Sequence, residues 1–274
     1  MVTGANSGIG YATAEALSRL GARVHMLCRN EQRGREAHTA LVQATGGDLV
    51  LHLVDVGDPE SVARYVEAPG ADRVDILVHN AGALLESRVV VEDGLETTLA
   101  VHVVGPLRLT AGLLPRMQGN PDEPARVVWV SSGGMYGKKL SVDRLAATSG
   151  PFDGVAAYAD AKRAQVVLSE QLAARLGPDV VSNAMHPGWA GTPGVVSALP
   201  TFYSLTKRIL RSRTEGADTV VWLAACRRIA RESGRFWFDR EAVSTHLWWK
   251  TRETEHERER LWEAAWRWAG IPAP

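Results

Sequence analysis

The sequence predicts an α/β fold in which a parallel sheet is covered by helices on both faces. Short apolar runs, typical of buried strands, alternate along the chain with longer segments of helical character. This order is typical of strand–helix–strand units. A glycine-rich turn also stands before the first helical segment. No repeat, low-complexity tract or linker interrupts the 274 residues, so we expect one domain over residues 1–274.

The individual elements follow from apolar runs and from helix-end signals. The expected strands are the apolar runs at 23–28, 49–54, 74–79, 127–130, 180–185 and 235–238. The expected helices are the segments at 11–20, 31–44, 157–176, 216–230 and, with an aromatic stripe, 251–268. A further helix should begin at Asp58, because an aspartate cap is followed there by Pro59 at the first helical position.

The start of the chain is unusual for this pattern. A strand should precede the glycine turn, yet only Met1 and Val2 stand before Thr3. We expect that so few residues cannot form a central strand, and therefore that the first strand is truncated and the true start lies upstream. If Met1 is the native start, we expect weak stability, and the mass of the native protein tests this.

Composition excludes several functional classes. The charge is balanced, with 31 basic and 31 acidic residues, so no electrostatic signature for nucleic acid or an acidic membrane surface exists. No apolar run of about 18 residues predicts a membrane anchor. Cys28 and Cys226 form neither a disulfide framework nor a metal site. We expect a cytoplasmic protein with a small-molecule partner.

The glycine turn is a candidate phosphate site. Glycines allow the backbone to turn tightly and to approach a phosphate, and the amides of the following helix would point at that phosphate. The alternative is an ordinary structural turn. The candidate cofactor-binding residues of this turn are Thr3, Gly4, Asn6, Ser7, Gly8, Ile9 and Gly10.

The residues that follow the expected strand at 23–28 indicate which dinucleotide cofactor the phosphate site would prefer. Sites of this type place an acid there for ribose hydroxyls or a base for a 2′-phosphate. This chain has Arg29, with Arg33 one turn later, and the guanidinium fork suits a phosphate. We therefore expect NADP, with NAD as the alternative; Arg29 as a solvated loop residue is the other interpretation.

Tyr158 and Lys162 are candidate proton-transfer residues. Four residues apart on a helix, they share one face. A nearby ammonium favours the phenolate, so we expect the phenol's pKa to fall from about 10 towards neutrality. The tyrosine would then act as general acid or base. Ser132 ends a strand and is a candidate to bind the substrate oxygen, although serine is also a common turn former and this tyrosine–lysine spacing occurs on many helices.

In combination, these residues resemble the short-chain dehydrogenase/reductase superfamily, in its retinol dehydrogenase and protochlorophyllide reductase branch. The motifs occur in family order: Thr3-Gly4-x-x-x-Gly8-x-Gly10, Asn80-Ala81-Gly82, Ser131-Ser132, Tyr158-x-x-x-Lys162 and His186-Pro187-Gly188 with Thr192. The stretches 132–136 and 236–240 resemble a subgroup of that branch, the member 12-like dehydrogenase/reductases.

The resemblance implies a Rossmann-like, doubly wound sheet of about seven parallel strands and a dimer or tetramer. It implies that Asp55 and Val56 lie near the adenine and that Lys162 also binds the nicotinamide ribose. Further cofactor-binding residues implied by the resemblance are Asn80, Ala81, Gly82, Pro187, Gly188, Trp189 and Thr192.

Two features depart from the family. His102 stands where relatives have an asparagine, whose backbone carbonyl supports a water-mediated proton relay behind the lysine. Its imidazole either titrates near about 6.5 and alters the pH profile, or is a paired helical histidine. The separation of 26 residues between Ser132 and Tyr158 is longer than in many relatives, and the segment 138–153 within it is expected to form an excursion over the site.

The expected function is that of an NADP-dependent oxidoreductase interconverting an alcohol and an apolar carbonyl, with Tyr158 as general acid or base. Trp189, Trp248 and Trp249 are candidates for an aromatic substrate wall, or else belong to the core. One alternative is a regulatory or scaffold protein that binds the cofactor without turnover. Another is a sugar-nucleotide epimerase, although no added substrate domain is visible.

Overall fold

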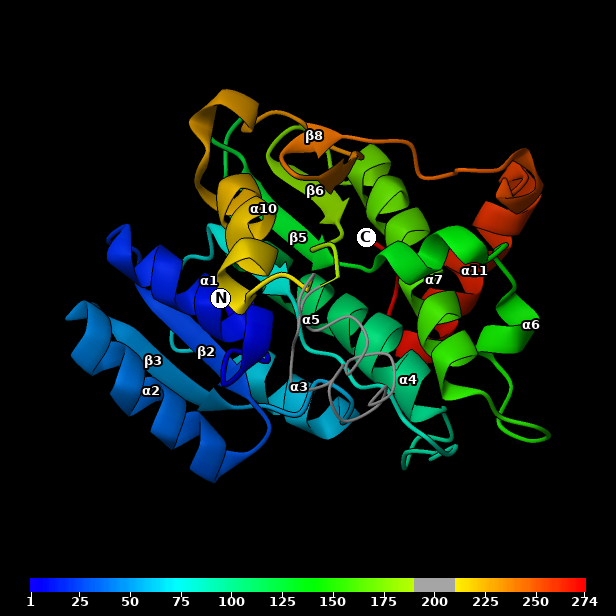
Figure 1. Cartoon of the computed structure of the whole chain (residues 1–274), viewed down its shortest axis with the longest axis horizontal. Coiled ribbons are helices and arrows are strands. Elements are labelled where there is room, and N and C mark those ends of the chain that lie inside the picture. Colours follow the sequence, from blue (N-terminus) through cyan, green and yellow to red (C-terminus); the bar gives the residue numbers. More distant parts are fainter. Residues whose placement is uncertain (190–209) are drawn as a thin grey trace.

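The structure is a computed structural model that describes residues 1–189 and 210–274 (Figure 1). Its strands form one eight-stranded sheet in the order β3-β2-β1-β4-β5-β6-β7-β8. Their bounds are β1 (Val2–Thr3), β2 (Val24–Cys28), β3 (Leu49–Leu53), β4 (Ile76–His79), β5 (Ala125–Val130), β6 (Val180–Met185), β7 (Phe236–Phe238) and β8 (Glu241–Ala242). The predicted doubly wound α/β fold is confirmed.

The prediction of about seven parallel strands, ending at 235–238, is confirmed, and one short strand that was not expected extends the sheet. β8 follows β7 and pairs with it antiparallel, whereas the other neighbours in the sheet are parallel. The turn between them is made by Asp239 and Arg240, whose φ angles are 49° and 63°. Two positive φ angles give the twist that a tight hairpin requires. No glycine marks this turn, so no hairpin signal was visible there.

The expectation that the few residues before the glycine turn cannot form a central strand was wrong. Val2 and Thr3 form a strand, and it lies in the middle of the sheet, between β2 and β4. Val2 pairs with Met26 on one side and with Val78 on the other. The ladder continues into the glycine turn, where the Gly4 N–H donates to the Leu27 carbonyl. Two residues are therefore sufficient, because both neighbouring strands supply hydrogen-bond partners.

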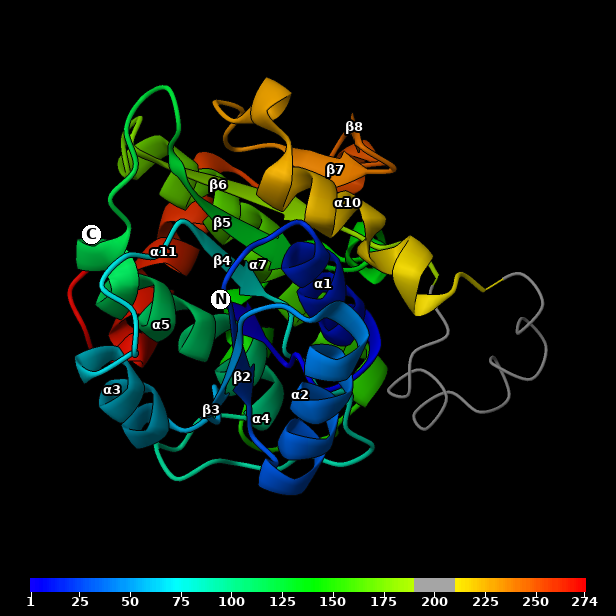
Figure 2. The ribbon, with the colours of Figure 1, turned by 90° about the vertical axis from the view of Figure 1, so that its left-hand side faces the viewer.

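Helices cover both faces of the sheet (Figure 2). Each face has its own apolar core. One face carries α1 (Gly8–Arg19), α2 (Glu31–Thr45) and α10 (Arg213–Ala225). The other carries α3 (Pro59–Glu67), α5 (Gly105–Leu113), α7 (Gly154–Arg175) and α11 (Glu255–Ala269). Asp58 caps α3 as predicted, since its side chain accepts from the Glu60 N–H. This layering leaves the carboxyl ends of the parallel strands as the natural place for a ligand.

A long helix that the sequence analysis did not anticipate packs under the sheet. It comprises α4 (Thr97–Leu99), a π-helical turn η1 (Ala100–Val104) and α5, and Glu96 caps its start. The segment is apolar on most sides and contains Gly105-Pro106, so neither amphipathic periodicity nor helix propensity marks it. Residues 97–116 are the one described helical stretch long and apolar enough to cross a membrane, but 72% of it is buried inside the protein, as in a core helix.

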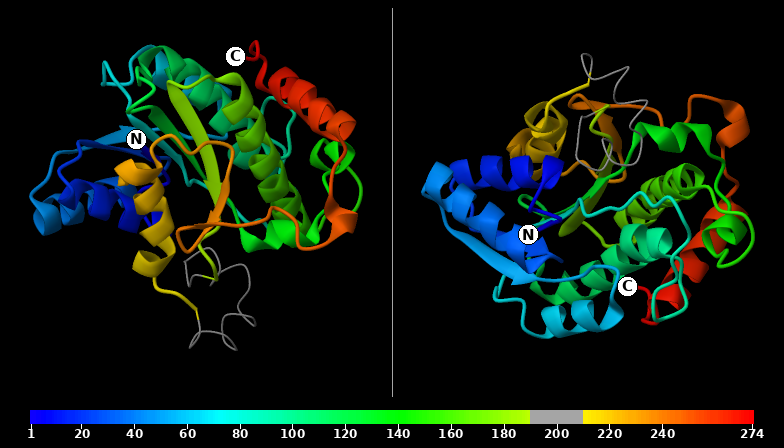
Figure 3. Two further views of the ribbon diagram at one scale, coloured as in Figure 1. Left: turned by 90° about the horizontal axis from the view of Figure 1, so that it is seen from above. Right: turned by 60° about the horizontal axis from the view of Figure 1, so that its bottom comes forward.

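The C-terminal helix and the segment 138–153 pack together beside α7 (Figure 3). The predicted aromatic stripe of α11 is confirmed, because Leu261, Trp262 and Ala265 are buried. The expected excursion over the site was wrong. Its helical turn α6 (Val142–Leu145) packs on α7 and α11, and Arg144 forms a hydrogen-bonded ion pair with buried Asp160 of α7. That ion pair holds the segment against the flank of α7.

Candidate active site

A cavity of about 480 Å³ opens at the carboxyl ends of the central strands. It is lined from both halves of the chain, by the glycine turn and by the face of α7 that carries Tyr158 and Lys162. The predicted site residues that line it are Gly4, Asn6, Ser7, Gly8, Ile9, Arg29, Asp55, Val56, Asn80, Ala81, Gly82, His102, Ser132, Tyr158, Lys162, Pro187, Gly188 and Trp189. The two segments that carried the sequence argument therefore share one cavity.

The glycine turn leaves its backbone open to the cavity. Gly4 and Gly8 have φ angles of 65° and 55°, which side-chain-bearing residues rarely adopt. α1 begins at Gly8, so its first amides face the cavity that Ser7 and Ile9 also line. An added Cβ on Gly10 would lie 2.3 Å from the Asn80 Nδ2 and 2.4 Å from the Gly4 carbonyl oxygen. Gly10 does not line the cavity, and its role is to let the turn pack closely.

Thr3 likewise shapes the turn and does not line the cavity. Its side chain is 1% exposed, and its Oγ1 accepts hydrogen bonds from the Asn80 and Ala81 N–H groups, both 2.9 Å. The Asn80 Nδ2 in turn donates to the Thr3 carbonyl at 2.9 Å. These bonds join the ends of β1 and β4, so Thr3 and Asn80 hold the glycine turn in place.

Two arginines lie at the far end of the cavity, past β2. Arg29 and Arg33 both line it, together with Asp55, whose carboxylate is 3.8 Å from the Arg29 guanidinium. The Arg29 side chain is 70% exposed, so this ion pair is weak. The Asp55 Oδ1 also accepts from the Gly57 N–H at 2.9 Å. The Asp55 carboxylate therefore stabilises the turn at residues 55–57, and the Arg29 guanidinium remains available to an anion.

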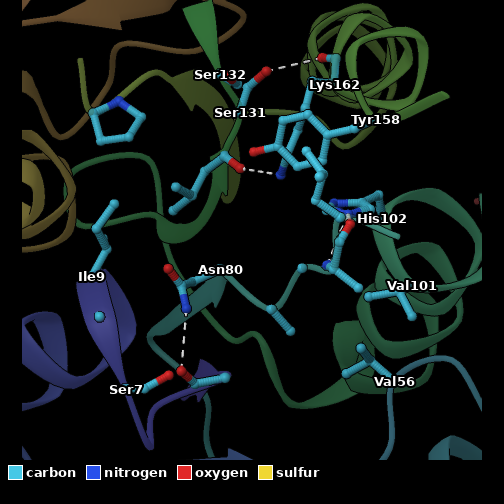
Figure 4. A pocket seen from close by; sticks show the side chains of 18 of the residues that line it. Ser7, Ile9, Val56, Asn80, Val101, His102, Ser131, Ser132, Tyr158 and Lys162 are labelled. Atoms are coloured by element: carbon cyan, nitrogen blue, oxygen red, sulfur yellow. Dashed lines mark hydrogen bonds between the residues drawn. The ribbon is translucent and has the colours of Figure 1, made fainter. Parts of the chain in front are cut away.

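Ser132, Tyr158 and Lys162 meet at the other end of the cavity (Figure 4). The Ser132 hydroxyl is hydrogen-bonded to the Tyr158 phenol. The Lys162 Nζ lies 5.4 Å from the centroid of the Tyr158 ring and donates to the Val130 carbonyl at 2.7 Å. The neighbouring Ser131 hydroxyl donates to the Lys162 carbonyl, which fixes α7 against β5. The serine, the phenol and the amine thus face one space.

Burial sets the protonation of this pair in a way that differs from expectation. It raises the pKa of Tyr158 to about 12, an effect that the hydrogen bond to Ser132 only partly opposes. It lowers the pKa of Lys162 from 10.5 to about 7. The predicted fall of the phenol's pKa was therefore wrong, because the loss of solvent on burial outweighs the hydrogen bond to Ser132. The phenol stays protonated at neutral pH.

His102 is a buried, neutral histidine in the π-helical turn. Burial and the Lys162 charge lower its pKa to about 3, so the alternative in which it titrates near neutrality was wrong. Its Nε2 lies 2.8 Å from the Ala83 carbonyl, and its ring meets the Tyr158 ring edge-on with centroids 5.2 Å apart. An added Cβ on Gly82 would lie 2.6 Å from the imidazole Cε1. Gly82 therefore provides the space that this larger side chain needs.

The aromatic candidates separate into two groups. Trp189 lines the cavity beside Pro187 and Gly188, and is 59% exposed. Trp248 and Trp249 are 68% and 75% exposed and do not line it, so their assignment to either a substrate wall or the core was wrong. Thr192 lies outside the described residues.

Gln165, a polar residue beside the lysine, was not among the predicted site residues. Its side chain is buried and accepts a hydrogen bond from the Lys162 Nζ. The signal was present, because residues three apart on a helix are neighbours. Among the described residues, no cluster of three or more histidine, cysteine, aspartate or glutamate side chains is arranged to hold a metal ion.

Comparisons with known proteins agree with this geometry. Residues 1–200 match the family model for short chain dehydrogenase. The human dehydrogenase/reductase SDR family member 12 is 42% identical over 250 residues, which cover 90% of this chain and 78% of that protein. Human retinol dehydrogenase 12 is 31% identical over 278 residues, covering 99% of this chain and 86% of that protein.

Solved structures match as well. A crystal structure of an uncharacterized protein from Mycobacterium paratuberculosis matches with a TM-score of 0.79 and 26% identity, covering 99% of this chain and 93% of that one. L-sorbose reductase from Gluconobacter frateurii, complexed with NADPH and L-sorbose, matches with a TM-score of 0.67 and 25% identity, covering 86% of this chain and 92% of that one. The chain belongs to the short-chain dehydrogenase/reductase family of oxidoreductases.

Proposed function

We propose that the protein is an NADPH-dependent reductase that converts an apolar aldehyde or ketone to an alcohol. The observation that carries this proposal is that the glycine turn and the Ser132–Tyr158–Lys162 group line one cavity. A dinucleotide bound along that cavity would bring its reactive end to the proton donor. Relatives crystallised with NADP or NADPH support the choice of cofactor.

The residues of the cavity fit this cofactor. Gly4 and Gly8 present no side chain to the cavity, and the first amides of α1 suit a pyrophosphate. Arg29 and Arg33 lie where a 2′-phosphate would extend, and no acid replaces them at the end of β2. When bound, NADPH supplies the hydride.

The chain's own residues supply the proton. Tyr158 donates its phenolic proton to the substrate oxygen, and its raised pKa keeps that proton in place until charge develops. The Ser132 hydroxyl stabilises the developing oxyanion. Lys162, held by the Val130 carbonyl, is next to the phenolate that forms and stabilises it. With a pKa of about 12, Tyr158 is in the protonated form that reduction requires at neutral pH.

The substrate end of the cavity favours an apolar carbonyl. Leu84, Val155 and Trp189 line it, and the exposed Val155 and Trp189 can cover a hydrophobic substrate. The names of the retinol dehydrogenases among the relatives agree with an apolar alcohol or aldehyde.

We also propose that the protein is a homo-oligomer. Light scattering on the purified protein tests this.

A carbonyl panel tests the proposal. Loss of NADPH absorbance is measured for the wild-type protein and for Tyr158→Phe, with short polar and longer apolar aldehydes and ketones. We expect turnover on the apolar substrates and a loss of kcat of about 10²–10⁴-fold in the variant. Unchanged turnover in Tyr158→Phe would exclude the assigned acid. Cofactor binding without turnover on any substrate would favour a regulatory role.

Cofactor preference is tested separately with Arg29→Asp. The variant removes the phosphate ligand and adds a carboxylate suited to ribose hydroxyls, so its affinity ratio of NADPH to NADH should fall by about tenfold or more. Arg35→Asp is the matched control, because Arg35 pairs with Glu31 on α2 and does not line the cavity. An equal ratio in both variants would remove Arg29 from the cofactor site.

A further inference from the structure

The lysine at the centre of the site is held from two sides. Its Nζ donates to the Val130 carbonyl at 2.7 Å and to the Gln165 Oε1 at 3.1 Å. Lys162 is 3% exposed and Gln165 is 1% exposed, so water competes for neither bond. Two of the three ammonium N–H groups are therefore committed to the protein, and one remains for the cavity that Lys162 lines.

The other end of the glutamine binds the backbone of the long helix. The Gln165 Nε2 donates to the His102 carbonyl at 2.7 Å. In an α-helix this carbonyl would accept from the residue four positions later, but that residue is Pro106, which has no N–H. The proline thus removes the α-helical competitor for the His102 carbonyl. Helix η1, in which His102 lies, is π-helical, a local widening often found at functional sites.

Only one orientation of the amide satisfies both ends. The ammonium offers only donors and the carbonyl offers only lone pairs, so Oε1 must face Nζ and Nε2 must face the His102 carbonyl. A flipped amide would set donor against donor and acceptor against acceptor. The two contacts therefore lock the glutamine, and the locked glutamine fixes the position of Nζ.

We infer that Gln165 is a positioning residue that ties the Lys162 ammonium to the His102 carbonyl and thereby sets where that ammonium meets Tyr158 and the ligand. The inference rests on the proposed function for the role of Lys162 and deepens it. The resemblance to the family implies a water between the lysine and this carbonyl, and here a side-chain amide makes that connection. An amide keeps its protons at neutral pH, so the connection fixes the lysine without carrying a proton.

The surroundings make the lysine's protonation a usable readout. The titratable groups that face the ammonium are Tyr158 on its own helix and neutral His102 on η1. The end of β5 faces it with the Val130 carbonyl and, beside it, the hydroxyls of Ser131 and Ser132. None of these groups is a carboxylate, so a glutamate at position 165 would place a new negative charge next to Nζ.

Three variants test the inference. Gln165→Leu removes both hydrogen bonds. Gln165→Glu keeps an acceptor towards Nζ but loses the donor to His102 and adds a negative charge, which raises the pKa of Lys162. Gln171→Leu is the matched control, because Gln171 is a buried glutamine on the same helix whose Nε2 donates to the Arg258 carbonyl, away from the cavity.

The first measurement is the pH profile of kcat. We expect Gln165→Leu to lower kcat about 10–100-fold with little change in KM, since a misplaced catalytic group affects the rate more than binding. In Gln165→Glu the midpoint assigned to Lys162 should move upward by one pH unit or more. Gln171→Leu should keep the wild-type profile. Wild-type kcat and midpoint in both Gln165 variants would overturn the inference.

The second measurement needs no ligand. The pKa of Lys162 is about 7 in the folded protein and 10.5 when unfolded, so the unfolded state binds more protons and this group makes stability rise with pH between those values. Gln165→Glu should remove the part of this rise that lies between pH 7 and the raised pKa of Lys162, and Gln171→Leu should retain the whole rise. An unchanged slope in Gln165→Glu would contradict the inference. A flattened slope in a protein that reduces no carbonyl would support it and reject the proposed function.

Discussion

The two ends of the cavity are formed by different kinds of chemical group. Around the glycine turn, the shape comes from backbone conformation and neutral hydrogen bonds among Gly4, Thr3 and Asn80. Around α7, it comes from titratable side chains whose pKa values burial has moved, namely Tyr158, Lys162 and His102. The glycine turn would therefore bind the cofactor through the shape of its backbone, whereas the residues around α7 would control the transfer of the proton. Substitutions at the first should therefore alter binding and folding, and those at the second should alter rate.

After that of Tyr158→Phe, the largest effect should come from Ser132→Ala. The variant removes the hydroxyl that bonds the phenol and faces the developing oxyanion, so kcat should fall about 10²–10³-fold while the NADPH affinity stays unchanged. Steady-state kinetics and a fluorescence titration measure the two quantities. Ser141→Ala removes a cap hydroxyl from α6 and serves as control. A variant that loses cofactor affinity and keeps kcat would break the division between the two ends.

The glycine turn should respond in the opposite way. In Gly10→Ala the new methyl meets the Gly4 carbonyl and the Asn80 amide, so the turn must shift, with a loss of about 1–3 kcal/mol of stability and weaker NADPH binding. Denaturant unfolding and cofactor titration measure both. At Gly137 an added Cβ meets nothing within 4 Å, and Gly137→Ala is the control. Wild-type NADPH affinity in Gly10→Ala would argue against a cofactor role for the turn.

Thr3→Val should weaken the same end without altering any surface of the cavity. The isosteric valine leaves the Asn80 and Ala81 N–H groups without their shared acceptor, which should lower the free energy of unfolding by about 2 kcal/mol. Urea unfolding measures it. Thr97→Val removes an exposed hydroxyl that bonds the Val89 carbonyl and should change little. Equal stability of the two variants would show that the link between β1 and β4 is unimportant.

The smallest effect should be a coupling between Gly82 and His102. Gly82→Ala alone presses a methyl against the imidazole and should destabilise the protein, whereas His102→Asn removes the ring and should absorb most of that penalty. A double-mutant cycle should give a coupling of about 1 kcal/mol. Because the pKa of His102 is about 3, His102→Asn should leave the pH–rate midpoints near neutrality where they are. Additive effects would show that the glycine does not serve the histidine.

How far the sequence predicts the molecule differs between these regions. Parallel strands and their helices were predictable, because each carries an apolar run or a cap such as Asp58. The residues of the cavity were predictable because motifs such as Gly4 to Gly10 and Tyr158 to Lys162 are local in sequence.

What escaped prediction depends on distant contacts. β1 exists because strands far along the chain pair with it, and the helix over 97–116 is apolar on most sides because it is buried. The pKa of Tyr158 depends on the solvent that folding removes, which no spacing shows. Gln165 was visible as a neighbour of Lys162, but its partner, the His102 carbonyl, is 63 positions away.

The hairpin of β7 and β8 has a consequence for the behaviour of the protein at high concentration. An unprotected outer strand is a template on which another chain can add, and this is a common route to aggregation. At this edge of the sheet the outermost strand is β8, which has only two residues and runs antiparallel to β7. Both of its residues, Glu241 and Ala242, are exposed. A strand this short, with an acidic side chain on it, offers an incoming chain little to pair with. That edge of the sheet is therefore guarded against intermolecular strand addition.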